Sequence, residues 1–113
     1  MTSQGTASGR FSRAIQQRNL FAAEIALKEM GRPSLLVALD YLAMLAELKP
    51  EKYPLGAIRW HGRLEMEATT LTLAESAYAL AALAALGEGD KGAVEVLRGL
   101  LRRVRPTLVP GVL

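Results

Sequence analysis

The sequence contains no cysteine, and its only histidine is His61. The lack of cysteine excludes disulfide bonds, thiolate catalysis, and zinc or iron–sulfur sites built on thiolates. His61 and Glu65 are spaced to lie on one helix face, but a metal site normally needs three or four ligands. No recognisable acid–base pair or cofactor loop is present either. We therefore expect no metal, no cofactor and no catalytic residue, and we interpret the protein as a non-enzyme.

Long apolar runs are also missing, although half of the residues are hydrophobic. A membrane-spanning helix needs about 20 apolar residues, whereas the most apolar stretch is uninterrupted only over Ala77–Leu86. The polar start of the chain, MTSQGTASGR, lacks the apolar segment of a secretory signal. From these absences we expect a cytoplasmic protein that does not act on a membrane.

Acidic residues are absent from both ends of the chain. Residues 1–23 carry a charge of +3 and residues 96–113 a charge of +4, while all 11 acids lie between them against seven basic residues, which leaves −4 there. Charge segregated in this way can indicate an anionic partner such as nucleic acid, or it can serve solubility and favour helix C-termini. The candidate nucleic-acid contacts are the arginines of the two ends: Arg10, Arg13, Arg18, Arg98, Arg102, Arg103 and Arg105.

The position of these arginines limits the kind of nucleic-acid contact that we expect. In a helix-turn-helix motif, the N-terminal residues of the recognition helix reach the bases. The helix expected over 90–104 begins with Asp90 and carries its arginines at the opposite end. We therefore expect sequence-tolerant contacts with phosphates rather than reading of the major groove.

Alanine and leucine are abundant, and their arrangement predicts an all-α fold. The clearest helix is LTLAESAYALAALAAL, residues 71–86, where Thr72 and Glu75 have the spacing of a capping box and Gly87 follows as a terminator. No β-branched residue interrupts the Ala/Leu run after Thr72. Because this helix is apolar on nearly every face, we expect it to be buried inside the domain.

Five further helical segments are predicted from apolar periodicity, caps and breakers. They begin near residue 10, at Asn19 as an N-cap, at Ser34 as an N-cap, and at Pro54; a last helix starts at Asp90. A continuous helix over 10–30 is an alternative to the break at Asn19. We expect a small bundle of five to six helices in one domain, residues 10–105, between a flexible leader, 1–9, and an extended apolar tail, 106–113.

An internal sequence similarity suggests how these helices are arranged. A shift of 38 residues aligns the apolar helix 35–48 with 71–86, and a shift of 36 aligns the helices that follow them more weakly. This similarity predicts stacked helix-turn-helix units, as in an α-solenoid, with residues 10–30 as a shorter unit. Shared Ala/Leu composition alone is the alternative explanation.

The two apolar helices also lead to the functional hypothesis. A domain of this size can enclose about one helix completely, yet 35–48 and 71–86 are both almost entirely apolar, with Asp40 and Glu47 expected to face water. We therefore expect a non-catalytic module that binds a protein partner or a second copy of itself, with nucleic-acid binding as the alternative. No small-molecule substrate is evident.

Three side chains are candidate partner contacts: Trp60, His61 and Tyr41. A lone tryptophan on an apolar stripe can anchor an interface, but it more often anchors the core. A histidine beside it can equally be a hydrogen-bonded interior residue. Both alternatives stay open at the level of the sequence.

Overall fold

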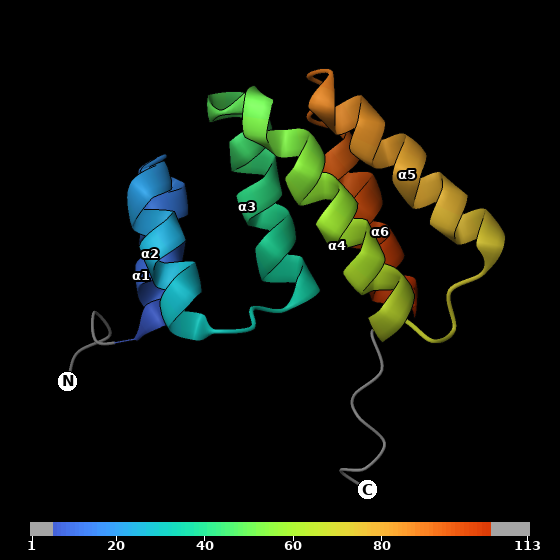
Figure 1. Cartoon of the computed structure of the whole chain (residues 1–113), viewed down its shortest axis with the longest axis horizontal. Helices are drawn as coiled ribbons and strands as arrows, with labels where there is room; N and C mark the ends of the chain where they lie inside the picture. The colour runs from blue at the N-terminus through green and yellow to red at the C-terminus, as the bar shows by residue number, and fades with distance from the viewer. Residues whose placement is uncertain (1–5, 105–113) are drawn as a thin grey trace, which may run out of the picture.

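The structure is a computed structural model, and it describes residues 6–104. Within this range the chain is all-α, which confirms the predicted fold class (Figure 1). The helices are α1 (Ala7–Gln16), α2 (Leu20–Met30), α3 (Leu35–Leu48), α4 (Tyr53–Glu67), α5 (Leu73–Gly87) and α6 (Ala93–Val104), with a short 3-10 helix η2 (Pro50–Lys52) before α4.

The helices pair in the order of the chain. α1 packs on α2, α3 on α4, and α5 on α6, and contacts of α4 with α5 and of α3 with α6 join the second pair to the third. Figure 1 shows the α1–α2 pair at one side of the molecule and α5 at the other. Short loops between antiparallel neighbours favour such an order in any helical bundle. The internal repeat therefore stays a prediction, because this pairing does not require one.

Side-chain caps fix the starts of four helices. Asn19, Ser34 and Thr72 each accept a hydrogen bond from a backbone N–H in the first turn of α2, α3 and α5. Thr72 and Glu75 form both bonds of the predicted capping box. Thr6 caps α1 in the same way through the N–H of Gly9, so α1 begins at Ala7, within the segment expected to be a flexible leader.

The last helix begins later than its sequence suggests. The Asp90 carboxylate accepts a hydrogen bond from the N–H of Gly92 at 3.0 Å, and the Asp90 carbonyl accepts one from Ala93 at 3.1 Å. Bonds between residues three apart make a tight turn rather than an α-helical one. α6 therefore begins at Ala93 instead of directly after Asp90.

Two hydrophobic cores hold the fold together. The larger one lies among α3, α4, α5 and α6, where Leu39, Leu64 and Leu97 are the largest fully buried side chains. The smaller one joins α1 and α2 to Met44 of α3. Two partly buried residues, Leu20 of α2 and Tyr41 of α3, pack against both cores and link them.

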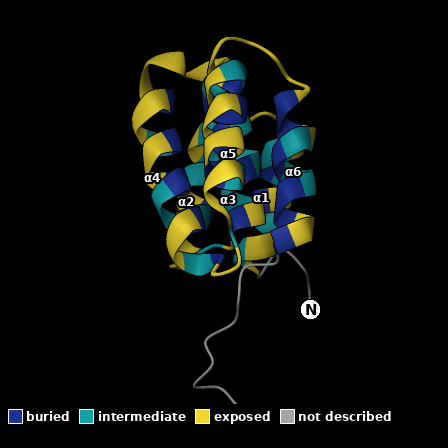
Figure 2. Ribbon diagram, turned by 90° about the vertical axis from the view of Figure 1, so that its right-hand side faces the viewer, coloured by how far each residue is buried: buried dark blue, intermediate teal, exposed yellow. Residues whose placement is uncertain are grey.

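The two apolar helices occupy different places. α3 is central and contacts each of the other five α-helices, whereas α5 lies at the edge and packs mainly on α4 and α6. One side of α5 is exposed along its length (Figure 2). The expectation that 71–86 is buried inside the domain is therefore wrong, because α3, α4 and α6 all pack against the same inner side of α5 and leave its outer side exposed.

Candidate functional site

The three candidate partner contacts point toward three different helices of the fold. Trp60 is 3% exposed, and its indole N–H donates a hydrogen bond to the Leu35 carbonyl of α3 at 2.9 Å. His61 is 9% exposed and faces α5. Tyr41 is partly buried, and its hydroxyl donates to Glu24 of α2 at 2.7 Å. The structure does not gather them on one surface, and Trp60 occupies the core position that was the alternative.

The protonation state of Tyr41 also depends on its contacts within the fold. Burial, together with the hydrogen bond and the negative charge of Glu24, raises the pKa of Tyr41 well above its ordinary value. The neutral phenol is therefore the form that the α2–α3 contact requires. Tyr41 serves this contact within the fold.

A second arrangement joins His61 to a serine and a glutamate. His61 Nε2 lies 2.9 Å from Ser76 Oγ and 3.2 Å from the Ser76 carbonyl oxygen. Ser76 donates its hydroxyl proton to Glu65 Oε2 at 2.7 Å. The carbonyl oxygen can only accept, and the single hydroxyl proton is already given to Glu65, so His61 Nε2 carries a proton and donates it toward Ser76.

This geometry is unsuited to nucleophilic catalysis. A serine nucleophile is activated by a histidine nitrogen that accepts its proton, whereas the nitrogen facing Ser76 is itself a donor. Ser76 is also only 8% exposed, and its neighbour His61 is similarly enclosed. The three side chains form a polar link between α4 and α5 that satisfies groups which would otherwise be buried without partners.

The candidate nucleic-acid contacts are mostly engaged by acids of the fold. Arg10 pairs with Glu29, and Arg103 pairs with Glu75 at the start of α5. Arg18 pairs with Glu47 at 2.6 Å. Ion pairs tie these arginines to neighbouring helices, which lowers the positive charge that they present to a polyanion.

Arg98 of α6 is also engaged by acids, one of them on the central helix α3. It donates to Asp40 of α3 at 2.6 Å and also to Glu95 one turn earlier on α6. The hydrogen bond to Asp40 raises the pKa of Arg98, and the hydrogen bond from Arg18 lowers the pKa of Glu47. The face of α3 that was expected to meet water therefore binds arginines from both sides, with Lys91 adding a contact to Glu47 at 3.5 Å.

Two of the candidate arginines differ from the others in their ion pairing. Arg13 and Arg102 form no ion pair with any residue in 6–104. Arg105 lies outside the described residues. The six described candidates are thus distributed over α1, the turn after it, and α6, and they do not make one continuous unpaired patch.

The most distinctive surface is the outer side of α5, which we call the α5 face. It consists of seven exposed residues, none of them charged: Leu73, Ala74, Ala77, Tyr78, Leu80, Ala81 and Ala84. Leu73 is 91% exposed, Tyr78 55% and Leu80 49%. A contiguous apolar surface of this kind is uncommon on a monomer and marks an interaction site more often than a solvated face.

A shallow groove continues the α5 face onto α4. Its volume is about 360 Å³, and Ile58 of α4 and Leu80 of α5 stand at its sides. Tyr53 also lines it, and the Tyr53 hydroxyl donates to the Leu83 carbonyl at 2.7 Å. Burial raises the pKa of Tyr53 to about 12, so the phenol is neutral over the physiological range. No acidic or basic side chain lines this groove.

The segment 71–86 was one of the expected sources of an apolar contact surface, but its sequence did not show which side is exposed, because the polar residues of α5 point inward. Glu75 bonds to the Thr72 amide and pairs with Arg103, and Ser76 bonds to α4. Polar positions usually mark the side of a helix that faces water, and here they mark the side that faces the domain. Only the contacts of Arg103 and His61, which are distant in sequence, reveal the orientation.

No family model matches this chain, and neither a curated protein nor a solved structure matches it. Among residues 6–104, no three histidine or acidic side chains converge in a way that could hold a metal ion. None of the helices in the described range has both the length and the apolar character needed to cross a bilayer.

Proposed function

We propose that this protein is a non-catalytic helical module that acts by protein–protein contact, and that a second copy of the chain binds to its α5 face. The observation that carries the proposal is the lack of any charged residue among the seven exposed residues of that face. Burying such a surface does not require any charged group to lose its water. Each Å² of apolar surface removed from water stabilises the complex by about 25 cal/mol.

The spacing of the exposed residues suits helix-to-helix packing. Leu73, Ala77, Leu80 and Ala84 follow one another at intervals of four, three and four residues, which is the pattern of a helical seam. Alanine is small enough to let a second helix approach closely, while the leucines and the Tyr78 ring provide apolar contact area. The groove beside Ile58 extends the surface beyond a single helix.

A second copy of the chain fits this surface because the surface complements itself. In a two-fold symmetric dimer each residue meets the same patch on the other subunit. A charged patch would face the same charge on the other subunit and be repelled, whereas the uncharged α5 face would pack against an identical apolar surface. The face runs over residues 73–84, which is roughly 18 Å of helix. This is small for an interface, and we expect a dissociation constant in the micromolar range.

Sedimentation equilibrium at several protein concentrations tests the proposal. We expect the wild-type chain to pass from monomer to dimer as its concentration rises through the micromolar range. Leu80→Glu places a charge in the centre of the face, and we expect it to weaken association at least tenfold, about 1.4 kcal/mol. Leu80→Glu and the wild type should have the same helical circular dichroism, since Leu80 is half exposed.

The matched control is Phe21→Glu, which introduces the same charge in place of a side chain that is 73% exposed on α2. α2 lies on the opposite side of the molecule from α5 (Figure 1). We expect this control to associate as the wild type does. A wild-type chain that stays monomeric at several hundred micromolar, or equal weakening by both substitutions, would contradict the proposal.

The nucleic-acid alternative stays a prediction, as does the cytoplasmic location. The pairing of Arg10, Arg18, Arg98 and Arg103 with acids of the fold gives the alternative less support than the charge of the two ends suggested. Phosphate contacts are strongest at low salt. Fluorescence anisotropy with duplex and single-stranded oligonucleotides at about 50 mM salt checks it, and the absence of binding there would remove it.

A further inference from the structure

A second cavity lies on another part of the molecule, where the N-terminus of α3 meets α4 and α6. Its volume is about 740 Å³, within the range of about 300–1,000 Å³ that is usual for small-molecule sites. Pro33, Leu35, Leu36 and Leu101 give it apolar walls. The charged residues that line it are four arginines and two acids: Arg32, Arg63, Arg98, Arg102, Asp40 and Glu67. We call it the arginine cavity.

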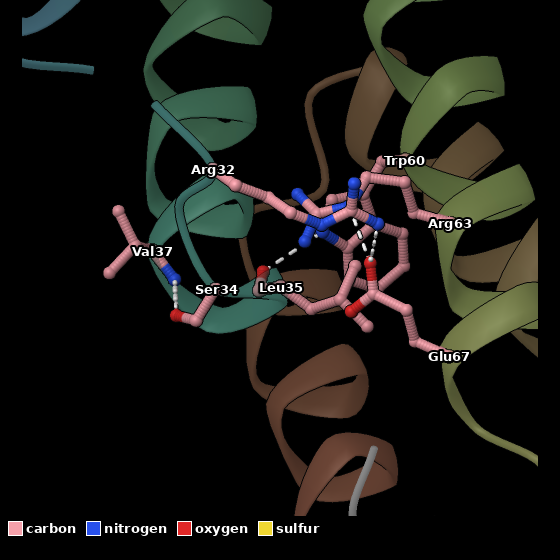
Figure 3. Close-up of polar contacts among 7 residues, drawn as sticks. All are labelled: Arg32, Ser34, Leu35, Val37, Trp60, Arg63 and Glu67. Atoms are coloured by element: carbon pink, nitrogen blue, oxygen red, sulfur yellow. Dashed lines mark hydrogen bonds and ion pairs between the residues drawn. The ribbon is translucent and has the colours of Figure 1, made fainter. Parts of the chain in front are cut away.

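One carboxylate in the arginine cavity is shared by two arginines. Glu67 Oε2 accepts a hydrogen bond from Arg63 Nε at 2.8 Å and another from Arg32 at 3.1 Å. Figure 3 shows the two guanidinium groups converging on this single carboxylate beside Leu35. Burial opposes ionisation of Glu67, but the hydrogen bonds and charges of the two arginines outweigh it and lower its pKa. One of these two positive charges has no carboxylate of its own.

The other side of the cavity holds an arginine without an ion-pair partner among residues 6–104. Asp40 is engaged by Arg98, which pairs with Glu95 as well. Arg102, one turn further along α6, forms no ion pair with a described residue. Two arginines of the cavity therefore lack a carboxylate of their own: Arg102, and one of the two that share Glu67. Guanidinium groups in this state are strong donors for carboxylates and phosphates.

We propose that the arginine cavity binds a small amphiphilic organic anion, with its acidic head on the arginines and its apolar body on the leucines. Such a ligand would contact both parts of the cavity. An apolar molecule would leave the arginines without an anionic partner, and an inorganic anion would leave the leucines exposed to water. The α5 face does not contribute to the cavity, so this inference does not depend on self-association.

The protein contains its own reporter for this site. Trp60 is the only tryptophan, and its indole N–H is bonded to the carbonyl of Leu35, which lines the cavity. In Figure 3 the Trp60 ring reaches from α4 to Leu35. The single indole resonance in a ¹H–¹⁵N spectrum should therefore shift when a ligand enters the arginine cavity.

The experiment is a titration of the full ¹⁵N-labelled chain with decanoate, compared with decanol and with inorganic phosphate. We expect decanoate to shift the Trp60 indole resonance in a saturable way and to bind at least about tenfold more tightly than either of the other two, since a hydrogen bond to a charged group is usually worth that much. Decanol tests the apolar body alone, and phosphate tests the acidic head alone.

A pair of double variants assigns the binding to the cavity. Arg32→Gln with Arg102→Gln removes two exposed charges and leaves the Arg63–Glu67 and Arg98–Asp40 pairs in place, and we expect it to weaken decanoate binding roughly tenfold or more. The matched control, Arg13→Gln with Arg59→Gln, removes the same net charge at positions outside the cavity and should bind as the wild type does.

Three outcomes would overturn the inference. They are equal affinity for decanol and decanoate, equal affinity for phosphate and decanoate, and equal weakening by the two double variants. Leu80→Glu serves as a separate control because it disturbs the α5 face alone. It should leave decanoate binding unchanged, so failure of the dimer proposal and failure of the cavity proposal can be told apart.

Discussion

α3 and α5 are nearly alike in composition and differ in their surroundings. Both are Ala/Leu-rich helices of similar length, preceded by a hydroxyl cap and carrying only two acidic or small polar side chains apiece. α3 contacts each of the other five α-helices, while α5 has its outer side in solvent. Composition thus decided that each segment is a helix, and the positions of the other helices decided how much of each is covered.

The acids of the two helices explain the difference in orientation. Asp40 and Glu47 of α3 bind arginines from α6 and from the α1–α2 turn, which brings those elements against the outer side of α3. On α5, Glu75 is bound by Arg103 from within the domain, and this leaves nothing to draw another element onto the opposite side. The same residue types therefore complete the enclosure of one helix and leave the other open.

The largest effect in this comparison should come from truncating one leucine on each helix. Leu39 of α3 is 0% exposed and Leu80 of α5 is 49% exposed. We expect Leu39→Ala to lower the free energy of unfolding by about 2–5 kcal/mol, because it leaves a cavity in a packed core. Leu80→Ala should change it by less than about 1 kcal/mol. Urea denaturation at a protein concentration below dimer formation measures both, and equal losses would show that α5 is covered as fully as α3.

An intermediate effect is expected where Gly87, at the end of α5, meets Tyr53 at the start of α4. A Cβ on Gly87 would lie 2.9 Å from the Tyr53 ring, which is buried and anchored by its hydroxyl, so the ring cannot move away freely. We expect Gly87→Ala to destabilise the fold by about 1–3 kcal/mol.

Gly62 in the middle of α4 is the control for this substitution, because a Cβ there meets nothing within 4 Å. Gly62→Ala should stabilise the protein by about 0.5–1 kcal/mol through helix propensity and a less flexible unfolded chain. Thermal denaturation of both variants provides the measurement. Stabilisation by Gly87→Ala would mean that the end of α5 is loosely held.

The smallest effect concerns Tyr53 and pH. Its hydroxyl bonds to the Leu83 carbonyl of α5, and burial raises its pKa to about 12 from an ordinary value of 10.0. A raised pKa means that the folded state holds the proton more tightly, so this stabilisation is complete below pH 10 and is lost as the pH rises toward 12. Tyr53→Phe should cost about 1 kcal/mol near pH 7.

The difference between wild type and Tyr53→Phe isolates this residue from other groups that titrate at high pH. We expect the difference in unfolding free energy to shrink between pH 10 and 12, measured by urea denaturation at each pH. A difference that stays constant over that interval would show that the phenol ionises as readily in the folded protein as in the unfolded one.

Local signals in the sequence predicted most of the helices. Asn19, Ser34 and Thr72 are caps whose effect depends on residues three positions away, and a pattern of that range can be recognised in a single chain. The start of α6 was missed because Asp90 can bond either to a helix or to a tight turn, and the glycine at position 92 allowed the turn.

The candidate site was less predictable because it depends on contacts between distant residues. Trp60 and His61 have chemistry that suits an interface, and only the neighbouring helices show that they are enclosed. The arginine cavity unites residues from α3, α4 and α6 that are far apart in the sequence. No spacing rule connects Arg32 with Arg102.

The presence of two separate cores has a consequence for how the molecule opens. α1 and α2 bury their apolar residues mainly against each other and Met44, so they can detach while the larger core stays closed. Amide hydrogens of α1 and α2 should then exchange with solvent sooner than those of α4 or α6, and proteases should cut near Gly31 first. Such a cut would leave a four-helix remnant that keeps both the α5 face and most of the arginine cavity.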